Sequence, residues 1–157
     1  MKERIVLLGG GGHCKVVIDA IISGGKYDIV GIIDPNIRPG EEVLGVQVLG
    51  NEDMLQGLAE KGVKCAFISV GSVGDCSTRK KIYEKIKNDF SIPSIIHPRA
   101  VIGREVKVGE GTFIAASATV NPGTKIGKNV IINTSSSIDH DCEVGDFVHV
   151  APGAVLS

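Results

Sequence analysis

An aliphatic residue recurs at every sixth position through the C-terminal part of the chain, and this period constrains the fold more than any other feature. The series has eleven members without an exception: Ile96, Ile102, Val108, Ile114, Val120, Ile126, Ile132, Ile138, Val144, Val150 and Leu156. The residue two places before each of them is small or β-branched, as at Ala118 and Val130. A period of six matches neither the period of about 3.6 residues of a helix nor the alternation of a flat strand.

Such a period suits a chain that turns a corner every six residues, so that three sides make an 18-residue coil with one aliphatic side chain per side pointing into a triangular prism. The residue after each aliphatic is mostly small or turn-forming, as at Gly103 and Asp139, and we expect it to supply the corners. The pattern resembles the hexapeptide repeat of left-handed parallel β-helices, and the left-handed sense is taken from that resemblance. An ordinary β-sandwich would need longer alternating strands and less regular turns.

The repeat region is predicted as a domain over residues 94–157, and it stops in mid-coil at Ser157. A solenoid needs a polar cap at each end, and the C-terminal end has none. We therefore expect the β-helix to be shortened at its C-terminus or to have its end supplied by something else.

Residues 1–93 have a different pattern, in which predicted strands alternate with predicted helices. Strands are expected at 4–8, 29–33 and 64–70, with a short extended piece at 46–48, and helices after the first strand, at 52–61 and at 78–90. This alternation is typical of a small parallel α/β sheet with Rossmann-like winding. The predicted fold is therefore an α/β Rossmann-like N-terminal domain followed by a left-handed parallel β-helix.

A glycine-rich turn joins the first strand to the first helix and places backbone N–H groups at a helix N-terminus, where anions bind. The full dinucleotide fingerprint fails, because Cys14 stands where a third small residue is needed. Asp34 ends the second strand, where dinucleotide-binding proteins keep an acidic residue. The candidate residues for a phosphate or nucleotide sugar are Gly10, Gly11, Gly12, His13 and Asp34. A purely structural turn and a nicotinamide-type cofactor site remain the alternatives.

The loop after the third strand falls on the same carboxyl edge of the sheet as the glycine turn. It brings Gly71, Ser72 and Arg79 to this edge as further candidates for the same ligand. Arg79 either reaches a ligand phosphate or is a solvated residue in the first turn of its helix.

Four histidines are candidates for proton transfer, and two of them lie in a polar stretch of the repeat. His97 is interpreted as structural, and His13 as a ligand contact. His140 and His149 occupy positions outside the aliphatic series, and carboxylates flank His140. An imidazole beside carboxylates keeps a pKa near neutrality and a defined tautomer, which a general base needs. An exposed surface histidine is the alternative for both.

Charge and cysteine content exclude several classes of protein. The formal net charge is −1 with both signs scattered, which does not suit binding to nucleic acid or to an anionic membrane. No apolar run approaches the length of a membrane span, and no signal peptide is recognisable. The four cysteines have no metal-site spacing, so we expect no metal, a reduced cytoplasmic setting, and a buried, inert Cys142.

The segment at residues 133–154, with Asp139-His140-Asp141 at its centre, and the opening Gly-Gly-Gly-Gly-His-Cys-Lys-Val-Val together resemble the sialic acid O-acetyltransferase-like family of sugar acyltransferases. The resemblance covers essentially the whole chain. It implies that residues 1–93 hold a nucleotide sugar and that the β-helix forms a homotrimer, with acetyl-CoA bound between neighbouring prisms. It further implies that His140 is the general base and that Asp141, where the family often has Glu, tunes it. Asn133 and His149 would line the site for acetyl-CoA and acceptor.

The sequence therefore predicts an acetyl-CoA-dependent acetyltransferase that acts on an amino or hydroxyl group of a nucleotide-activated bacterial sugar. Acetyl-CoA would be a co-substrate, and no covalent enzyme intermediate is implied. Two alternatives stay open: the same fold acting on a small non-sugar amine such as serine, and a non-catalytic β-helix protein that binds sugar nucleotides.

Overall fold

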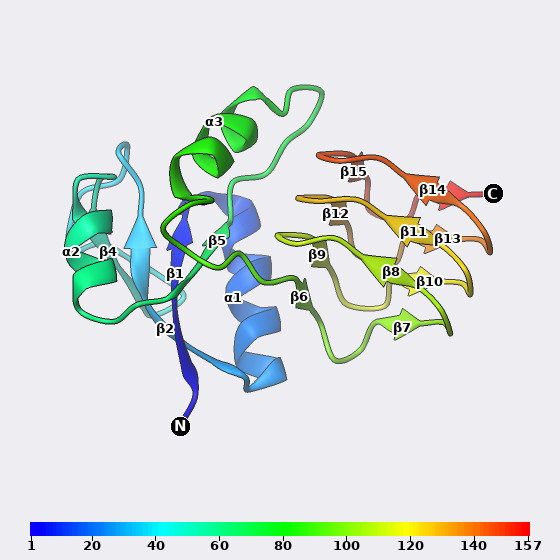
Figure 1. The fold of residues 1–157 in the computed structure, drawn as a ribbon, viewed down its shortest axis with the longest axis horizontal. Helices are drawn as coiled ribbons and strands as arrows, with labels where there is room; N and C mark the ends of the chain where they lie inside the picture. The colour runs from blue at the N-terminus through cyan, green and yellow to red at the C-terminus, as the bar shows by residue number, and fades with distance from the viewer. The chain divides into compact units, whose positions relative to one another are not determined.

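The computed structural model describes residues 1–157, which divide into two compact units, Met1–Pro93 and Ser94–Ser157 (Figure 1). The first unit is an α/β domain built on one sheet, and the second is a left-handed β-helix with three parallel sheets of short strands. The predicted fold class is confirmed. None of the helices is both long enough and apolar enough to cross a membrane.

The first unit alternates strands and helices around a five-stranded sheet with the order β3-β4-β2-β1-β5. Its elements are β1 (Glu3–Leu8), α1 (Gly12–Gly24), β2 (Tyr27–Ile33), β3 (Glu42–Val43), β4 (Val46–Gly50), α2 (Met54–Glu60), β5 (Cys65–Ile68) and α3 (Ser77–Ile86). All pairings are parallel except that of β3 with β4. The four apolar residues of β1 are all buried, as expected for a central strand covered on both faces.

The sequence placed the elements of this unit correctly but not all their ends. The hairpin strand β3 is an addition to the predicted set, and it makes the sheet mixed rather than wholly parallel. Helix α3 ends at Ile86, earlier than predicted, because the chain turns at once and both Asp89 and Phe90 donate their N–H to the Ile86 carbonyl. Phe90 is nevertheless buried in the core of this unit.

The second unit is a stack of coils in which each strand is two residues long. Its strands are β6 (Ile95–Ile96), β7 (Val101–Ile102), β8 (Lys107–Val108), β9 (Phe113–Ile114), β10 (Thr119–Val120), β11 (Lys125–Ile126), β12 (Ile131–Ile132), β13 (Ser137–Ile138), β14 (Glu143–Val144), β15 (His149–Val150) and β16 (Val155–Leu156). Each strand pairs in parallel with the strand 18 residues away, as Thr119 does with Val101 and with Ser137. The sheets are β16-β13-β10-β7, β14-β11-β8 and β15-β12-β9-β6, and Figure 1 shows β8, β11 and β14 stacked along one of them.

The aliphatic series fills the prism only in the middle of the stack. Seven members, from Ile114 to Val150, are buried in one core together with Ala118 and Val130. Ile96, Ile102 and Leu156 are more than a third exposed. They lie in the outermost coils of this unit, which have a neighbouring coil on one side only.

The corners are made at a different position from the one predicted. Positive φ angles recur every six residues, three places after each aliphatic, at Glu105, Gly111, Ser117, Gly123, Asn129, Ser135, Asp141, Phe147 and Gly153. The small residues that directly follow the aliphatics have another cause, which is close backbone approach between coils. A Cβ on Gly103 would lie 2.6 Å from the backbone nitrogen of Pro122, and a Cβ on Gly109 would lie 2.5 Å from the carbonyl carbon of Gly127.

The burial profile of the series predicts the effect of truncating its members. Ile132→Ala should lower the free energy of unfolding of the β-helix by about 2–5 kcal/mol, because Ile132 is fully buried and its loss leaves a cavity. Ile102→Ala, at the same repeat position in an outer coil, should cost less than about 1.5 kcal/mol. Denaturant unfolding of the two variants checks this, and equal losses would contradict the burial profile.

Candidate active site

His140 lies in a turn between β13 and β14 and is bonded to the residue that follows it. Its Nδ1 is 2.8 Å from Oδ2 of Asp141, and both side chains are more than two-thirds exposed. Asp141 has a φ of 57°, the left-handed conformation that recurs at this place in every coil. This conformation, which aspartate tolerates better than most residues, lets adjacent residues turn their side chains toward each other.

A second carboxylate holds the backbone of His140. Asp139 Oδ1 accepts a hydrogen bond of 2.8 Å from the His140 N–H. The same oxygen accepts a bond of 3.1 Å from Nδ2 of Asn121, which lies 18 residues earlier on the preceding coil. Neither Asp139 nor Asn121 was predicted as a site residue from the sequence. The 18-residue spacing was the signal that could have linked them.

The two carboxylates act on the charge of the imidazole. The hydrogen bond to Asp141 and the charges of Asp139 and Asp141 raise the pKa of His140 above its ordinary value of 6.5. Hydrogen bonds from the His140 N–H and from Asn121 lower the pKa of Asp139, so this carboxylate is ionised at neutral pH. With Nδ1 facing Asp141, Nε2 is the ring nitrogen left to meet a substrate.

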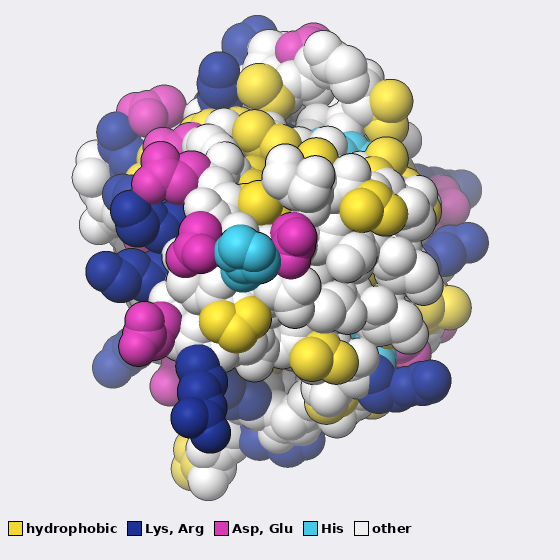
Figure 2. Space-filling view, turned by 90° about the vertical axis from the view of Figure 1, so that its right-hand side faces the viewer, with side chains coloured by type: hydrophobic (Ala, Val, Ile, Leu, Met, Phe, Trp, Pro, Cys, Tyr) yellow, Lys and Arg dark blue, Asp and Glu magenta, His cyan; other side chains and the backbone are white.

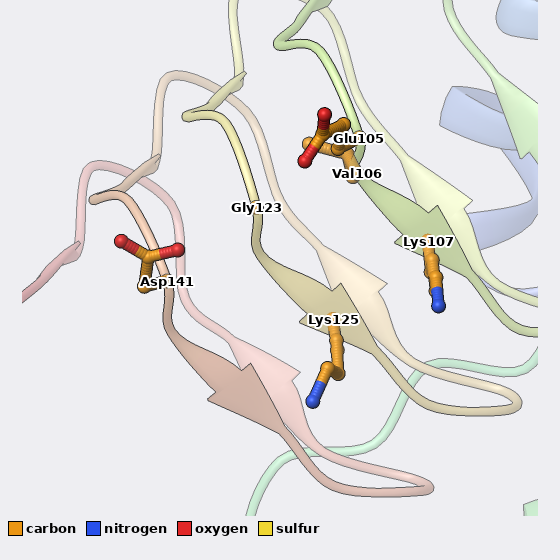
Figure 3. A pocket seen from close by; sticks show the side chains of 6 residues that line it. All are labelled: Glu105, Val106, Lys107, Gly123, Lys125 and Asp141. Carbon is orange, nitrogen blue, oxygen red and sulfur yellow. The ribbon is translucent and has the colours of Figure 1, made fainter.

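Asp141 also borders a hollow of about 450 Å³ on the corner of the β-helix. Figure 3 shows its lining, in which Asp141 and Glu105 lie toward one end and the two lysines extend from neighbouring strands; the residues are Glu105, Val106, Lys107, Gly123, Lys125 and Asp141. Gly123 is required here, because a Cβ would lie 2.4 Å from Oδ1 of Asp141 and its φ is +78°. Lys125 is paired with Glu143, at 2.8 Å.

The other predicted pair, Asn133 and His149, forms a separate cluster. Nδ2 of Asn133 lies 3.0 Å from Nε2 of His149, and Asn133 Oδ1 accepts from the Thr134 N–H at 2.8 Å. Asn133 directly follows β12, before the corner at Ser135, and His140 follows β13, before the corner at Asp141, so the two clusters lie at the two ends of the side that contains β13. Asn133 is thus bonded to His149, and His140 to Asp141.

The side between these clusters is uncharged. Because strand residues alternate, the residues pointing out of the sheet β16-β13-β10-β7 are Val101, Thr119, Ser137 and Val155. The adjoining sheet β14-β11-β8 carries Lys107, Lys125 and Glu143 in the equivalent places. Figure 2 shows a face of the molecule on which a histidine lies between acidic side chains, among uncharged and apolar ones.

In the first unit, Asp34 ties the glycine turn to the end of β2. Its Oδ2 accepts from the Gly10 N–H and its Oδ1 from the Asn36 N–H, each at 2.8 Å. Gly11 and Gly12 are exposed, and a Cβ on either would meet no atom within 4 Å. The turn is thus fixed by a carboxylate and open on the side of Gly11 and Gly12.

The loop after β5 lies against this turn. A Cβ on Gly71 would be 3.3 Å from Cβ of His13, and the Ser69 hydroxyl donates to the Gly9 carbonyl at 2.6 Å. Ser72 is buried in the same loop. The structure therefore brings the predicted residues of the glycine turn and of this loop to one edge of the sheet.

Arg79 is buried, contrary to one of the two alternatives that its position in the sequence left open. It is 1% exposed, so it is not a solvated helix residue. Its Nη1 donates to the carbonyls of Val70 at 2.6 Å and Ile68 at 3.2 Å, at the end of β5. Burial lowers its pKa to about 10. These contacts of Nη1 hold the start of the Gly71 loop.

The remaining predicted features concern metal and thiol chemistry. No group of three or more His, Cys, Asp or Glu side chains is gathered as a metal ion would require. Cys142 is half-buried beside the prism core, not fully buried as expected, because its coil lies near the end of this unit.

Models of two protein families match the chain. The PglD N-terminal domain matches residues 4–86, and the bacterial transferase hexapeptide (six repeats) matches residues 123–157. Among curated proteins, GDP-perosamine N-acetyltransferase of Escherichia coli is 30% identical over 132 residues, covering 83% of this chain and 57% of that protein. The chain therefore spans just over half the length of this relative.

Two solved structures are similar over nearly the whole chain. A histidine-to-asparagine mutant of perosamine N-acetyltransferase from Caulobacter crescentus, in complex with CoA and GDP-perosamine, has a TM-score of 0.88 and 36% identity, covering 96% of this chain and 70% of that one. The acetyltransferase domain of PglB from Neisseria gonorrhoeae, in complex with acetyl coenzyme A, has a TM-score of 0.88 and 32% identity, covering 100% of this chain and 74% of that one.

The contacts of His140 predict its titration. Its pKa, followed by NMR of the imidazole C–H signals, should lie above 6.5, and Asp141→Asn should lower it because the amide carries no charge. Since the folded pKa is the higher one, the stability that the pair contributes is fully present below the unfolded pKa and is lost as pH rises through the folded pKa. Glu143→Gln, which removes a carboxylate bonded to Lys125 instead, is the control. Equal His140 pKa values in Asp141→Asn and the parent would contradict the contact.

Proposed function

Because the chain belongs to the PglD N-terminal domain family of hexapeptide-repeat transferases, we propose that it transfers the acetyl group of acetyl-CoA to an amino group of a nucleotide-activated sugar. The observation that carries the proposal is the exposed His140, whose Nδ1 is bonded to Asp141 on a corner of the β-helix. The relatives named for perosamine N-acetylation support the choice of an amino acceptor.

His140 acts as the general base through Nε2. The amino nitrogen attacks the thioester carbonyl, a C–N bond forms, and Nε2 takes the proton from the nitrogen. The C–S bond then breaks, and the proton passes from the imidazolium to the leaving thiolate of CoA. Asp141 accepts the hydrogen bond from Nδ1–H and stabilises the imidazolium while it exists.

The raised pKa of His140 has a definite consequence for this reaction. A stronger base takes the proton from the nucleophile more readily, but it must be neutral to do so. The rate should therefore rise with pH through the raised pKa of His140 and level off above it.

The edge of the first unit binds the nucleotide sugar. The exposed turn at Gly11 and Gly12 leads into the N-terminus of α1, where backbone N–H groups and the helix dipole favour phosphate. His13 and the Gly71 loop lie beside this turn, and Ser72 belongs to the same loop. Asp34 and Arg79 shape the edge through backbone hydrogen bonds rather than by facing the ligand.

A homotrimer with shared sites accounts for the two separate polar clusters. His140 and Asp141 lie at one end of the uncharged side, and Asn133 and His149 at the other. If this side packs against a second copy, the His140 corner of one chain can meet the Asn133 corner of the next. Acetyl-CoA and the acceptor would then bind between the two prisms.

His140→Ala tests the proposed base. In the protein at its full natural length, kcat should fall by about 10²–10⁴ with both substrate affinities retained, because the proton is transferred only in the transition state. Release of CoA thiol with UDP-, GDP- and CMP-linked amino sugars as acceptors measures this, and the same sugars bearing hydroxyl in place of amino, together with serine, serve as controls. Turnover above about a third of the parent's would refute His140 as the base, and no transfer to any nucleotide sugar by the parent would refute the function.

Gly11→Val tests the nucleotide-sugar edge independently of catalysis. The added side chain meets no protein atom at its Cβ and φ is −75°, so the variant should fold, but its branches block approach to the turn. Calorimetry should then show at least about tenfold weaker binding of the nucleotide sugar, with acetyl-CoA binding unchanged. Unaltered sugar binding in a folded variant would contradict the proposal and would mean that the turn has only a structural role.

A further inference from the structure

The turn that carries His140 is held by the preceding coil in two ways, and only one of them is general to the repeat. The Thr124 hydroxyl donates to the Asp139 carbonyl at 2.8 Å and accepts from the Cys142 N–H at 3.3 Å. A second threonine, Thr112, does the same at another corner, where it donates to the Gly127 carbonyl and accepts from the Val130 N–H. This pair of threonine hydrogen bonds therefore stabilises the stacking of coils at more than one corner and is not specific to the turn of His140.

The second contact that holds this turn is the hydrogen bond from the Asn121 side chain to the Asp139 side chain. These two residues occupy the place directly after the aliphatic in successive coils, where backbones approach closely. At the next corner the same place holds Gly109, Gly127 and Gly145, so no side chain at this place joins the coils. The bridge at that corner comes from Asp146, one residue further on. At the corner of His140 this place holds Gly103, then Asn121 and Asp139, and the side chains of the last two are bonded to each other. The bonded pair directly precedes His140, whose N–H donates to Asp139 Oδ1.

We propose that Asp139, anchored by Asn121, is a positioning residue for His140; this inference rests on the proposed role of His140 as the general base. The geometry gives it two effects. Its Oδ1 receives the His140 N–H at 2.8 Å and so fixes the backbone from which the imidazole projects. Its negative charge favours the protonated imidazole, while Asp141 holds Nδ1. Two carboxylates thus orient the imidazole: Asp139 fixes the backbone of His140, and Asp141 holds its Nδ1.

The surroundings of His140 contain few competing charges. Asp139 and Asp141 are the charged groups that act on it. The preceding coil contributes Asn121 and Gly123 at this corner, and neither titrates. The hollow beside Asp141 also contains Glu105, Lys107 and Lys125, of which Lys125 is paired with Glu143, and none of them is changed in the variants below. A change in the titration of His140 on replacing Asp139 can therefore be assigned to Asp139.

Three variants separate charge from geometry. Asp139→Asn keeps an oxygen that can accept from the His140 N–H but removes the charge. It should lower the His140 pKa, move the rising limb of the pH–rate profile to lower pH and reduce kcat up to about fivefold. Asp139→Ala also removes the backbone hydrogen bond and should reduce kcat about tenfold or more, as misplacement of a catalytic group does. Asn121→Ala leaves the charge but frees Asp139, and should lower kcat with KM for both substrates unchanged.

Asp146→Asn is the matched control. Asp146 Oδ1 accepts the backbone N–H of Lys128 at 2.8 Å, 18 residues earlier, so it makes a comparable bridge between coils at a corner without a histidine. The two measurements are the His140 pKa by NMR and the pH dependence of kcat. Changes in the Asp139 and Asn121 variants that are absent from Asp146→Asn support the proposal. A His140 pKa and kcat in Asp139→Ala equal to those of Asp146→Asn overturn it. The NMR readout needs no turnover, so failure of His140 as the base, seen in His140→Ala, is distinguished from failure of this inference.

Discussion

The stacking of one coil on the next, in register at 18 residues, is the constraint on which the second unit depends. Each strand pairs in parallel with the strand 18 residues away, as Lys125 does with Lys107 and with Glu143. The register brings backbones within reach at the residue after each aliphatic and forces a left-handed residue two places later. The aliphatic core stabilises the stack, but this register decides which side chains become neighbours.

The candidate active site follows from that register. Asp141 stands at a left-handed corner over Gly123, and Asp139 stands over Asn121. His140 lies between them, so both of its carboxylate contacts come from adjacent residues whose own places are fixed by the coil beneath. Because the site is built on a rigid stack rather than on a free loop, an exposed histidine can hold a defined orientation.

Much of this arrangement can be read from the sequence, because it is periodic. The six-residue series predicts the β-helix, and the strand–helix alternation predicts the α/β sheet. The corners were misplaced because both the left-handed position and the close-approach position select small residues, and Glu105 or Phe147 at the former gives no hint of a positive φ. The burial of Arg79 was not predicted, because nothing in its helix pattern reveals that it turns back to the carbonyls of β5. Asp139 was passed over for Asp141, since a contact through the His140 backbone leaves no mark in a single sequence. The roles of His140, Asn133 and the glycine turn in binding and catalysis stay predictions.

The register also separates the His140 corner from the Asn133 corner, and the proposed homotrimer would bring these two corners of neighbouring chains together in one site. This shared site is tested most directly by co-expressing two variants, His140→Ala and His149→Ala, each of low activity when expressed alone. If each site takes one corner from each of two chains, mixed assemblies contain some interfaces with both native corners, and transfer activity should reappear. A mixture no more active than the separate variants would mean that each chain carries its site alone, and would contradict the account.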